Sequence, residues 1–119
     1  ALAFAQLFVG ESGTMASESA VLGTPAIFIN NNHFGCIDDQ ANYGLIFTYT
    51  ESEGDQIAAI KKAEELALKP NTKSEYLPKR EKLLADKIDV SAFLIWFVEN
   101  YPESVKEVKA KDFDFGRFK

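Results

Sequence analysis

The residues best suited to bind a ligand are the glycines and hydroxyl side chains of one short turn, Gly10-Glu11-Ser12-Gly13-Thr14. Glycine lets a ligand approach the backbone closely, and the free N–H groups in the first turn of a following helix favour an anion. A phosphate or diphosphate group therefore suits this turn. The turn is neither a Walker motif nor a full dinucleotide fingerprint, so it could also be a plain connection from strand to helix.

A second polar segment, residues 30–36, contains the only histidine, His33. An imidazole exchanges protons near neutral pH, so His33 is a candidate sugar contact or general acid–base catalyst, besides being an ordinary surface residue. Cys36, Asp38 and Asp39 lie close to it in the sequence and could be drawn with it as a metal cluster. Their spacing matches no known metal loop, and we expect no metal.

A serine hydrolase is the competing enzyme class, with Ser12 as nucleophile and His33 as base. Asp38 or Asp39 would be the third member of its triad. However, the turn lacks the final glycine of the G-x-S-x-G nucleophile elbow, and the chain order Ser, His, Asp is not that of α/β-hydrolases. These two departures disfavour the hydrolase.

The turn and the segment after it resemble a nucleotide-sugar site. Residues 10–18, Gly-Glu-Ser-Gly-Thr-Met-Ala-Ser-Glu, and residues 22–28, Leu-Gly-Thr-Pro-Ala-Ile-Phe, are similar to the C-terminal domain of GT-B-fold enzymes. Both the non-hydrolysing UDP-N-acetylglucosamine 2-epimerases and the peptidoglycan N-acetylglucosaminyltransferase share this similarity. An uncharacterised microbial family of that fold is closer still, because it also resembles the Trp-Phe-Val-Glu-Asn-Tyr-Pro-Glu-Ser stretch of residues 96–104.

The resemblance implies a role for each matching residue of the turn and helix. Ser12, Gly13 and Thr14 would face the diphosphate through backbone N–H and hydroxyl groups. Glu18 would accept hydrogen bonds from the ribose hydroxyls, although an acidic residue near a positive helix start is also ordinary. Glu11 departs from the pattern, because a carboxylate beside a diphosphate would repel it unless it points away.

The resemblance also implies a sugar-binding region. Gln40 and Asn42 resemble the Gln- and Asn-bearing segment that holds sugar hydroxyls in the transferase group, and His33 would be a second sugar contact. The parent protein would then be a UDP-sugar transferase or epimerase that needs no cofactor. Since the active site of GT-B enzymes lies between two domains, this chain would supply one wall and be inactive alone.

Three apolar segments predict buried strands, at residues 7–9, 26–29 and 45–49. Short helical segments separate them, which indicates an α/β fold with a Rossmann-like, three-layer partial parallel sheet. Successive right-handed crossovers place such strands side by side in chain order. We therefore expect the loops at 10–14 and 30–36 to lie at the same edge of the sheet.

Helical periodicity predicts a C-terminal extension made of helices. Ile57 and Ile60 share one face of a first helix, and Leu77 and Leu84 share one face of a second. Residues 93–98 are apolar all round, which on a helix means burial or a partner surface. The predicted helices cover residues 15–22, 55–69, a start at 74–78 to about 88, and a start at 89–91 to 101, with a helical turn at 40–43.

Composition narrows the class of protein. The 119 residues amount to one ordinary domain, and 46% hydrophobic with 26% charged residues is typical of globular proteins. A net charge of −5 argues against nucleic-acid binding, and no apolar run approaches the length that spans a bilayer. The single cysteine cannot form an internal disulfide, which favours a reducing cytoplasm.

We therefore predict that residues 1–119 form a single domain, a fragment of a GT-B C-terminal nucleotide-sugar-binding domain. The sequence begins within a helix-like spacing of Ala and Phe, without an initiating methionine, and we expect it to be part of a longer protein. The alternative is a non-catalytic, self-associating α/β module without ligand. A homodimer is expected in either case, because the strand at 7–9 has an unpaired edge and residues 93–98 offer an apolar surface.

Overall fold

The chain folds into two compact units, residues 1–83 and residues 84–119. The computed structural model describes all of residues 1–119. Chain length alone predicts one folding unit, and the structure differs because the last 36 residues gather around aromatic side chains of their own. Each unit is therefore described by itself.

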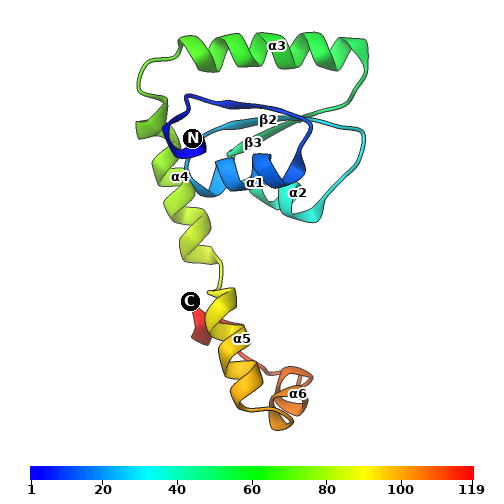
Figure 1. Cartoon of the computed structure of the whole chain (residues 1–119), viewed down its shortest axis with the longest axis vertical. Coiled ribbons are helices and arrows are strands. Elements are labelled where there is room, and N and C mark those ends of the chain that lie inside the picture. Colours follow the sequence, from blue (N-terminus) through cyan, green and yellow to red (C-terminus); the bar gives the residue numbers. More distant parts are fainter. The chain divides into compact units, whose positions relative to one another are not determined.

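The first unit is built on a parallel sheet of three strands in the order β1-β2-β3 (Figure 1). Strand β1 (Phe8–Gly10) pairs with β2 (Ala26–Ile29), which pairs with β3 (Ile46–Tyr49). In this register Val9 lies beside Ile27, and Ile27 lies beside Phe47. The predicted α/β class, parallel direction and strand order are confirmed, and the strand positions agree to within one residue.

Helices cover both faces of this sheet. Helices α1 (Gly13–Val21) and α2 (Gly35–Asn42) lie on one face, and α3 (Glu53–Leu68) lies on the other (Figure 1). Helix α2 begins well before the predicted turn at 40–43, because Gly35 follows an extended Phe34 and Asp38 in the first turn suits the positive helix start. The connection from β2 to β3 thus contains a complete helix.

The helices approach the sheet through small side chains. Ala16, Ser19 and Ala20 of α1 are fully buried, which lets that helix pack closely. Helix α3 buries Ala59 instead of the predicted stripe, so Ile57 stays 49% exposed. Leu66, seven residues further along, is buried on the same face, and the small Ala59 lets the helix approach the strands closely there.

Helix α4 (Thr72–Asp86) packs its aromatic side chain inward. It begins before the predicted start at 74–78 and contains Pro78. Tyr76 and Leu83 are buried rather than the predicted Leu77 and Leu84, because the large Tyr76 ring removes more apolar surface from water. Burial raises the pKa of Tyr76 to about 12.

Helix α4 also contacts the end of α1. The backbone at Gly23 has a φ of 77°, a left-handed conformation that ends α1. A Cβ atom at this position would lie 3.2 Å from both Arg80 and Leu77. The Arg80 side chain donates a hydrogen bond from Nε to the Val21 carbonyl at 2.7 Å. Glycine is therefore favoured here by its φ, and a Cβ atom would in addition require the Arg80 and Leu77 side chains to shift.

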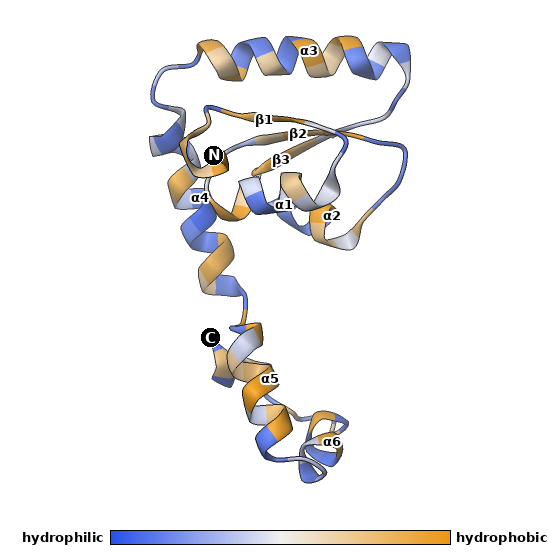
Figure 2. Ribbon diagram, in the orientation of Figure 1, coloured by the Kyte–Doolittle hydropathy of each residue, from blue (hydrophilic) through white to orange (hydrophobic).

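The second unit consists of α5 (Val90–Glu99), α6 (Glu103–Val108) and a short 3-10 helix, η2 (Phe115–Phe118). Asp89 caps α5 by accepting a hydrogen bond from the Ala92 N–H at 3.0 Å. Phe93 packs edge-on against Phe118, and Figure 2 shows how much of α5 is hydrophobic. No helix combines the length and the apolar character needed to cross a membrane.

Side chains of the tail stack on one face of α5. The ring centroids of Trp96 and Phe113 are 5.4 Å apart, and the Arg117 guanidinium lies 4.0 Å from the centre of the Trp96 ring. The opposite side of α5 carries Leu94 and Val98, which are 53% and 71% exposed. The tail thus covers the aromatic face of the helix and leaves an aliphatic face open.

We predict that Gly23→Ala lowers the free energy of unfolding by at least about 1–2 kcal/mol, because a left-handed φ is costly for alanine and its Cβ meets α4. Gly54→Ala is the matched control. No atom lies within 4 Å of a Cβ there, and α3 gains helix propensity, so stability should rise by up to about 1 kcal/mol. Urea unfolding monitored by circular dichroism compares the two variants. Equal changes in the free energy of unfolding would contradict a specific need for glycine at position 23.

Candidate functional site

The glycine turn forms the start of α1. Ser12 is the N-cap, and its Oγ accepts a hydrogen bond from the Met15 N–H at 3.3 Å. Gly13 lies against the Phe34 ring, to which a Cβ atom would come within 3.6 Å. The Asn30 side chain donates to the Glu11 carbonyl at 3.4 Å, so the loops at 10–14 and 30–36 meet at one edge, as predicted.

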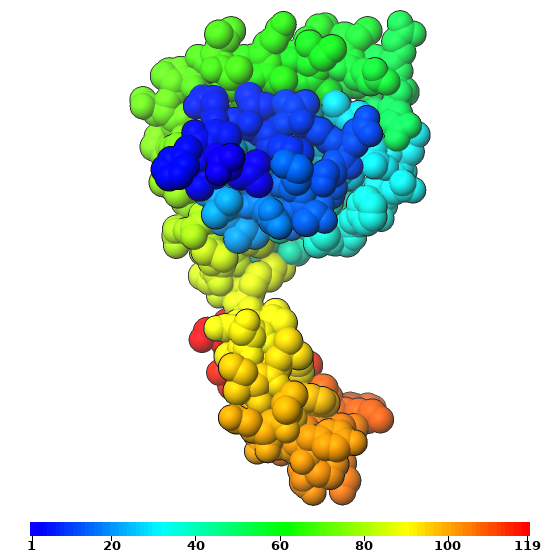
Figure 3. All heavy atoms as spheres, in the orientation of Figure 1, coloured from blue at the N-terminus to red at the C-terminus, as the bar shows by residue number.

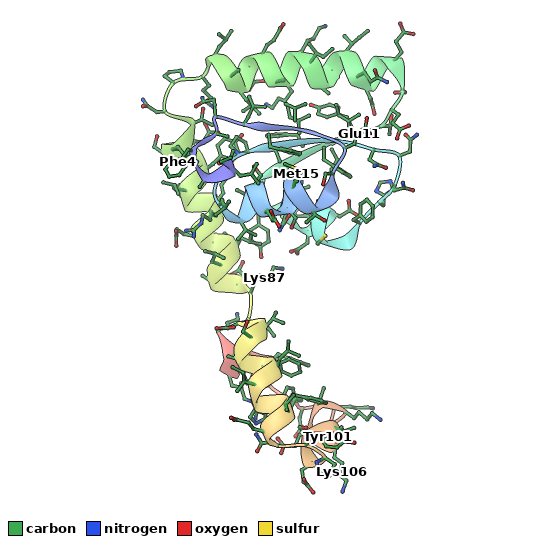
Figure 4. The ribbon with its side chains drawn as sticks, in the orientation of Figure 1. Phe4, Glu11, Met15, Lys87, Tyr101 and Lys106 are labelled. Carbon is green, nitrogen blue, oxygen red and sulfur yellow. The ribbon has the colours of Figure 1, made fainter.

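A pocket of about 360 Å³ opens beside this turn. Its walls come from the first turns of α1 and from the start of α2, and α1 lies on the visible face of the molecule in Figure 3. Glu18 is exposed there, whereas Glu11 is not part of the wall and lies at the end of β1 (Figure 4). The lining residues are Gly13, Thr14, Ser17, Glu18, Phe34 and Cys36.

Gln40, which the resemblance marks as a sugar contact, lies behind this pocket. It is only 7% exposed, and its Nε2 donates a hydrogen bond to the Ser17 Oγ at 2.9 Å. Its Oε1 is buried without a hydrogen-bond partner. Gln40 therefore reaches the pocket through Ser17 and not by its own surface.

A second, smaller hollow of about 80 Å³ lies where β2 and β3 end. Phe34 borders both hollows and stands edge-on to Phe28, with ring centroids 6.0 Å apart. His33 lines this smaller hollow and places its Nδ1 3.7 Å from the Asp38 carboxylate. The His33 side chain is 87% exposed, so water screens this pair strongly.

Asp55 and Thr50 are joined by two short hydrogen bonds at the smaller hollow. The Thr50 hydroxyl and backbone N–H both donate to Asp55 Oδ2, at 2.6 Å and 2.7 Å. These two hydrogen bonds, led by that of the hydroxyl, lower the pKa of Asp55 below its usual value. The carboxylate fixes the loop between β3 and α3.

The hydrolase and metal alternatives gain no support from this geometry. The Ser12 hydroxyl is engaged as a helix cap, and the His33 ring pairs with Asp38. Neither contact connects Ser12 to His33 as a nucleophile to its base. No group of three or more histidine, cysteine, aspartate or glutamate side chains is arranged to hold a metal ion.

Sequence reasoning missed two wall residues, Ser17 and Phe34. The signal for Ser17 was present, because residues three and four apart share a helix face and Ser17 follows Gly13 by four. Phe34 gave no comparable signal, since its contact with Gly13 joins two loops that are distant in sequence. No family model, curated protein or solved structure matches the chain.

We predict that Thr50→Val raises the pKa of Asp55, because the substitution removes the hydroxyl donor and keeps the backbone N–H. A depressed folded pKa stabilises the protein above the unfolded pKa, and this stability is lost as the pH falls through the folded pKa. As the pH is lowered, the Thr50→Val protein should therefore begin to lose stability at a higher pH than the wild-type protein. A carboxyl NMR titration tests this with Glu75 as internal control, and an unchanged Asp55 pKa would contradict it.

Proposed function

We propose that the first unit is the nucleotide-sugar-binding portion of a glycosyltransferase-like or sugar-epimerase-like protein, with a UDP-sugar as ligand. The observation that carries this proposal is the 360 Å³ pocket, in which the start of α1 and the Glu18 carboxylate form a continuous wall. An anion and a group of hydroxyls can bind there at the same time.

The spacing of the wall matches the parts of a nucleotide. Gly13 and Thr14 of the wall offer backbone N–H groups and the Thr14 hydroxyl for a diphosphate, at the positive end of α1, and the cap residue Ser12 borders them. Glu18 follows Thr14 by one helical turn, or about 6 Å along the axis, and accepts hydrogen bonds from ribose. Glu11 is exposed and does not line the pocket, which agrees with a carboxylate that points away from the diphosphate.

The sugar would extend towards Phe34, whose ring gives an apolar wall on the α2 side. His33 lies beyond this ring and is the candidate to contact the sugar or to exchange a proton with it. The chain supplies one wall of the reaction site, so we propose that it binds without turning over substrate. The unpaired Cys36 thiol suits a cytoplasmic location.

We predict that UDP binds to the wild-type protein and that Glu18→Ala weakens UDP at least about tenfold while leaving inorganic phosphate nearly unchanged. The carboxylate addresses ribose, whereas the backbone amides address charge. Isothermal titration calorimetry measures both ligands, with Glu64→Ala on α3 as a control that should bind like the wild type.

A second readout uses Cys36, the single cysteine, which lines the same pocket. Bound UDP should slow its alkylation by a maleimide in the wild-type protein, and much less so in Glu18→Ala. Equal losses of UDP and phosphate affinity would remove Glu18 from the ribose role, and no UDP binding at all would refute the proposed function.

Self-association is the second candidate function, and the open face of α5 favours it. Val90, Leu94, Ile95 and Val98 are all more than half exposed. Burying large aliphatic side chains of this kind contributes roughly 1.5–3 kcal/mol each. The outer edge of β1 is also unpaired, because β1 ends the sheet. We propose a homodimer that forms through the aliphatic face of α5.

We predict a mass near twice 13.2 kDa in light scattering at micromolar concentration, and a return to 13.2 kDa in Leu94→Glu. A charge at this position cannot be buried against a second copy at low cost. Ser74→Glu, on the exposed surface of α4, is the control and should remain dimeric. A monomeric wild-type protein would refute self-association without bearing on UDP binding.

A further inference from the structure

Among the buried side-chain polar atoms, the Oε1 of Gln40 lacks a hydrogen-bond partner. Burying an unpaired acceptor costs free energy, and native proteins usually pair such groups. An apolar side chain of similar length would fill the same space between α1 and α2 without this cost. Packing alone therefore does not explain an amide at position 40. Its one hydrogen bond, to Ser17, indicates that the amide acts on that hydroxyl.

That hydrogen bond determines what Ser17 can offer to a ligand. A serine hydroxyl has one proton to donate and two lone pairs that accept. The Gln40 Nε2 donates to the Ser17 Oγ at 2.9 Å, so one lone pair is occupied and the hydroxyl proton must point elsewhere. Ser17 is half-buried and lines the 360 Å³ pocket, so its hydroxyl can donate to a ligand bound there.

Ser17 also occupies the middle of a longer groove. Ser17 and Glu18 border both the 360 Å³ pocket and a third hollow of about 310 Å³, which continues along α1 to Val21 and Leu22. The ionised Glu18 carboxylate accepts hydrogen bonds and donates none, whereas the Ser17 hydroxyl can donate one. The two neighbours together match a ligand that presents a hydroxyl next to an acceptor oxygen.

We infer that Ser17 contacts the ligand as a hydrogen-bond donor and that Gln40 is the positioning residue that orients it. The matching ligand class is a ribose phosphate ester, whose ring hydroxyls face Glu18 while an ester or phosphate oxygen accepts from Ser17. This inference rests on the proposed function, and it adds a hydrogen-bond donor next to Glu18, further along α1 than the donors of the glycine turn. Gln40 acts through Ser17 and touches no ligand itself.

The test compares UDP affinity with thermal stability in matched variants. Ser17→Ala should weaken UDP about tenfold, the usual effect of removing one hydrogen bond to a charged or strongly polar group. Gln40→Met keeps the length of the side chain and removes the amide. It should weaken UDP to a similar extent while the midpoint of thermal unfolding stays the same or rises, because the unpaired acceptor is gone.

Ser19→Ala is the control for a purely structural effect. Ser19 lies on the buried side of the same helix, where its Oγ donates to the Thr24 carbonyl at 3.0 Å. Its removal should lower thermal stability and leave UDP affinity unchanged. The double variant Ser17→Ala/Gln40→Met should bind UDP no more weakly than Ser17→Ala, because the amide acts only through the hydroxyl.

Each outcome decides between named alternatives. Absence of UDP binding to the wild-type protein overturns the proposed function and this role together. Wild-type affinity in Ser17→Ala overturns the role of Ser17 alone. Wild-type affinity in Gln40→Met, or additive losses in the double variant, overturns the positioning role of Gln40. If Gln40→Met does not fold, Gln40→Leu replaces it in the same comparison.

Discussion

The burial of β2 on both faces is the constraint on which the first unit depends. Ala26, Ile27 and Phe28 are at most 2% exposed, so helices must cover the sheet on each side. Parallel neighbours also require crossover connections, and α1, α2 and their loops provide them. Because every crossover starts from the same edge of the sheet, the turn after β1 and the loop after β2 meet there. The candidate site is a consequence of how the core is covered.

The division of α1 into two faces links this core to the pocket. Small residues such as Ala16 and Ala20 place the helix close to the sheet, and the opposite side is left with Thr14 and Glu18 at the surface. Gln40 departs from this apolar packing, since a buried amide with one unpaired atom stabilises the fold less than an apolar residue would. A binding role for Ser17 gives this residue a physical reason.

The second unit is organised by aromatic contacts instead of by a sheet. Rings from the tail and from α5 pack against one another, and Arg117 lies over Trp96. None of the α5 residues is fully buried, and Ser104 is the one fully buried side chain of the unit. So small a unit gains little from its own core. An additional surface that covers the aliphatic face of α5 would therefore add a large fraction of its stability.

The sequence by itself determined the class, direction and order of the strands, because apolar runs, glycine turns and right-handed crossovers are local or nearly local constraints. It also identified the turn at 10–14, whereas the cap at Ser12 was found only in the structure. Only the tertiary structure decided which helix faces are buried: α3 turned Ala59 inward instead of Ile57, and α4 turned Tyr76 inward instead of Leu77. Helical periodicity gives a stripe, whereas the fit against a particular sheet selects among competing stripes. The contacts of Ser17 with Gln40 and of Gly13 with Phe34 join segments about twenty residues apart, so only packing in three dimensions could bring them together.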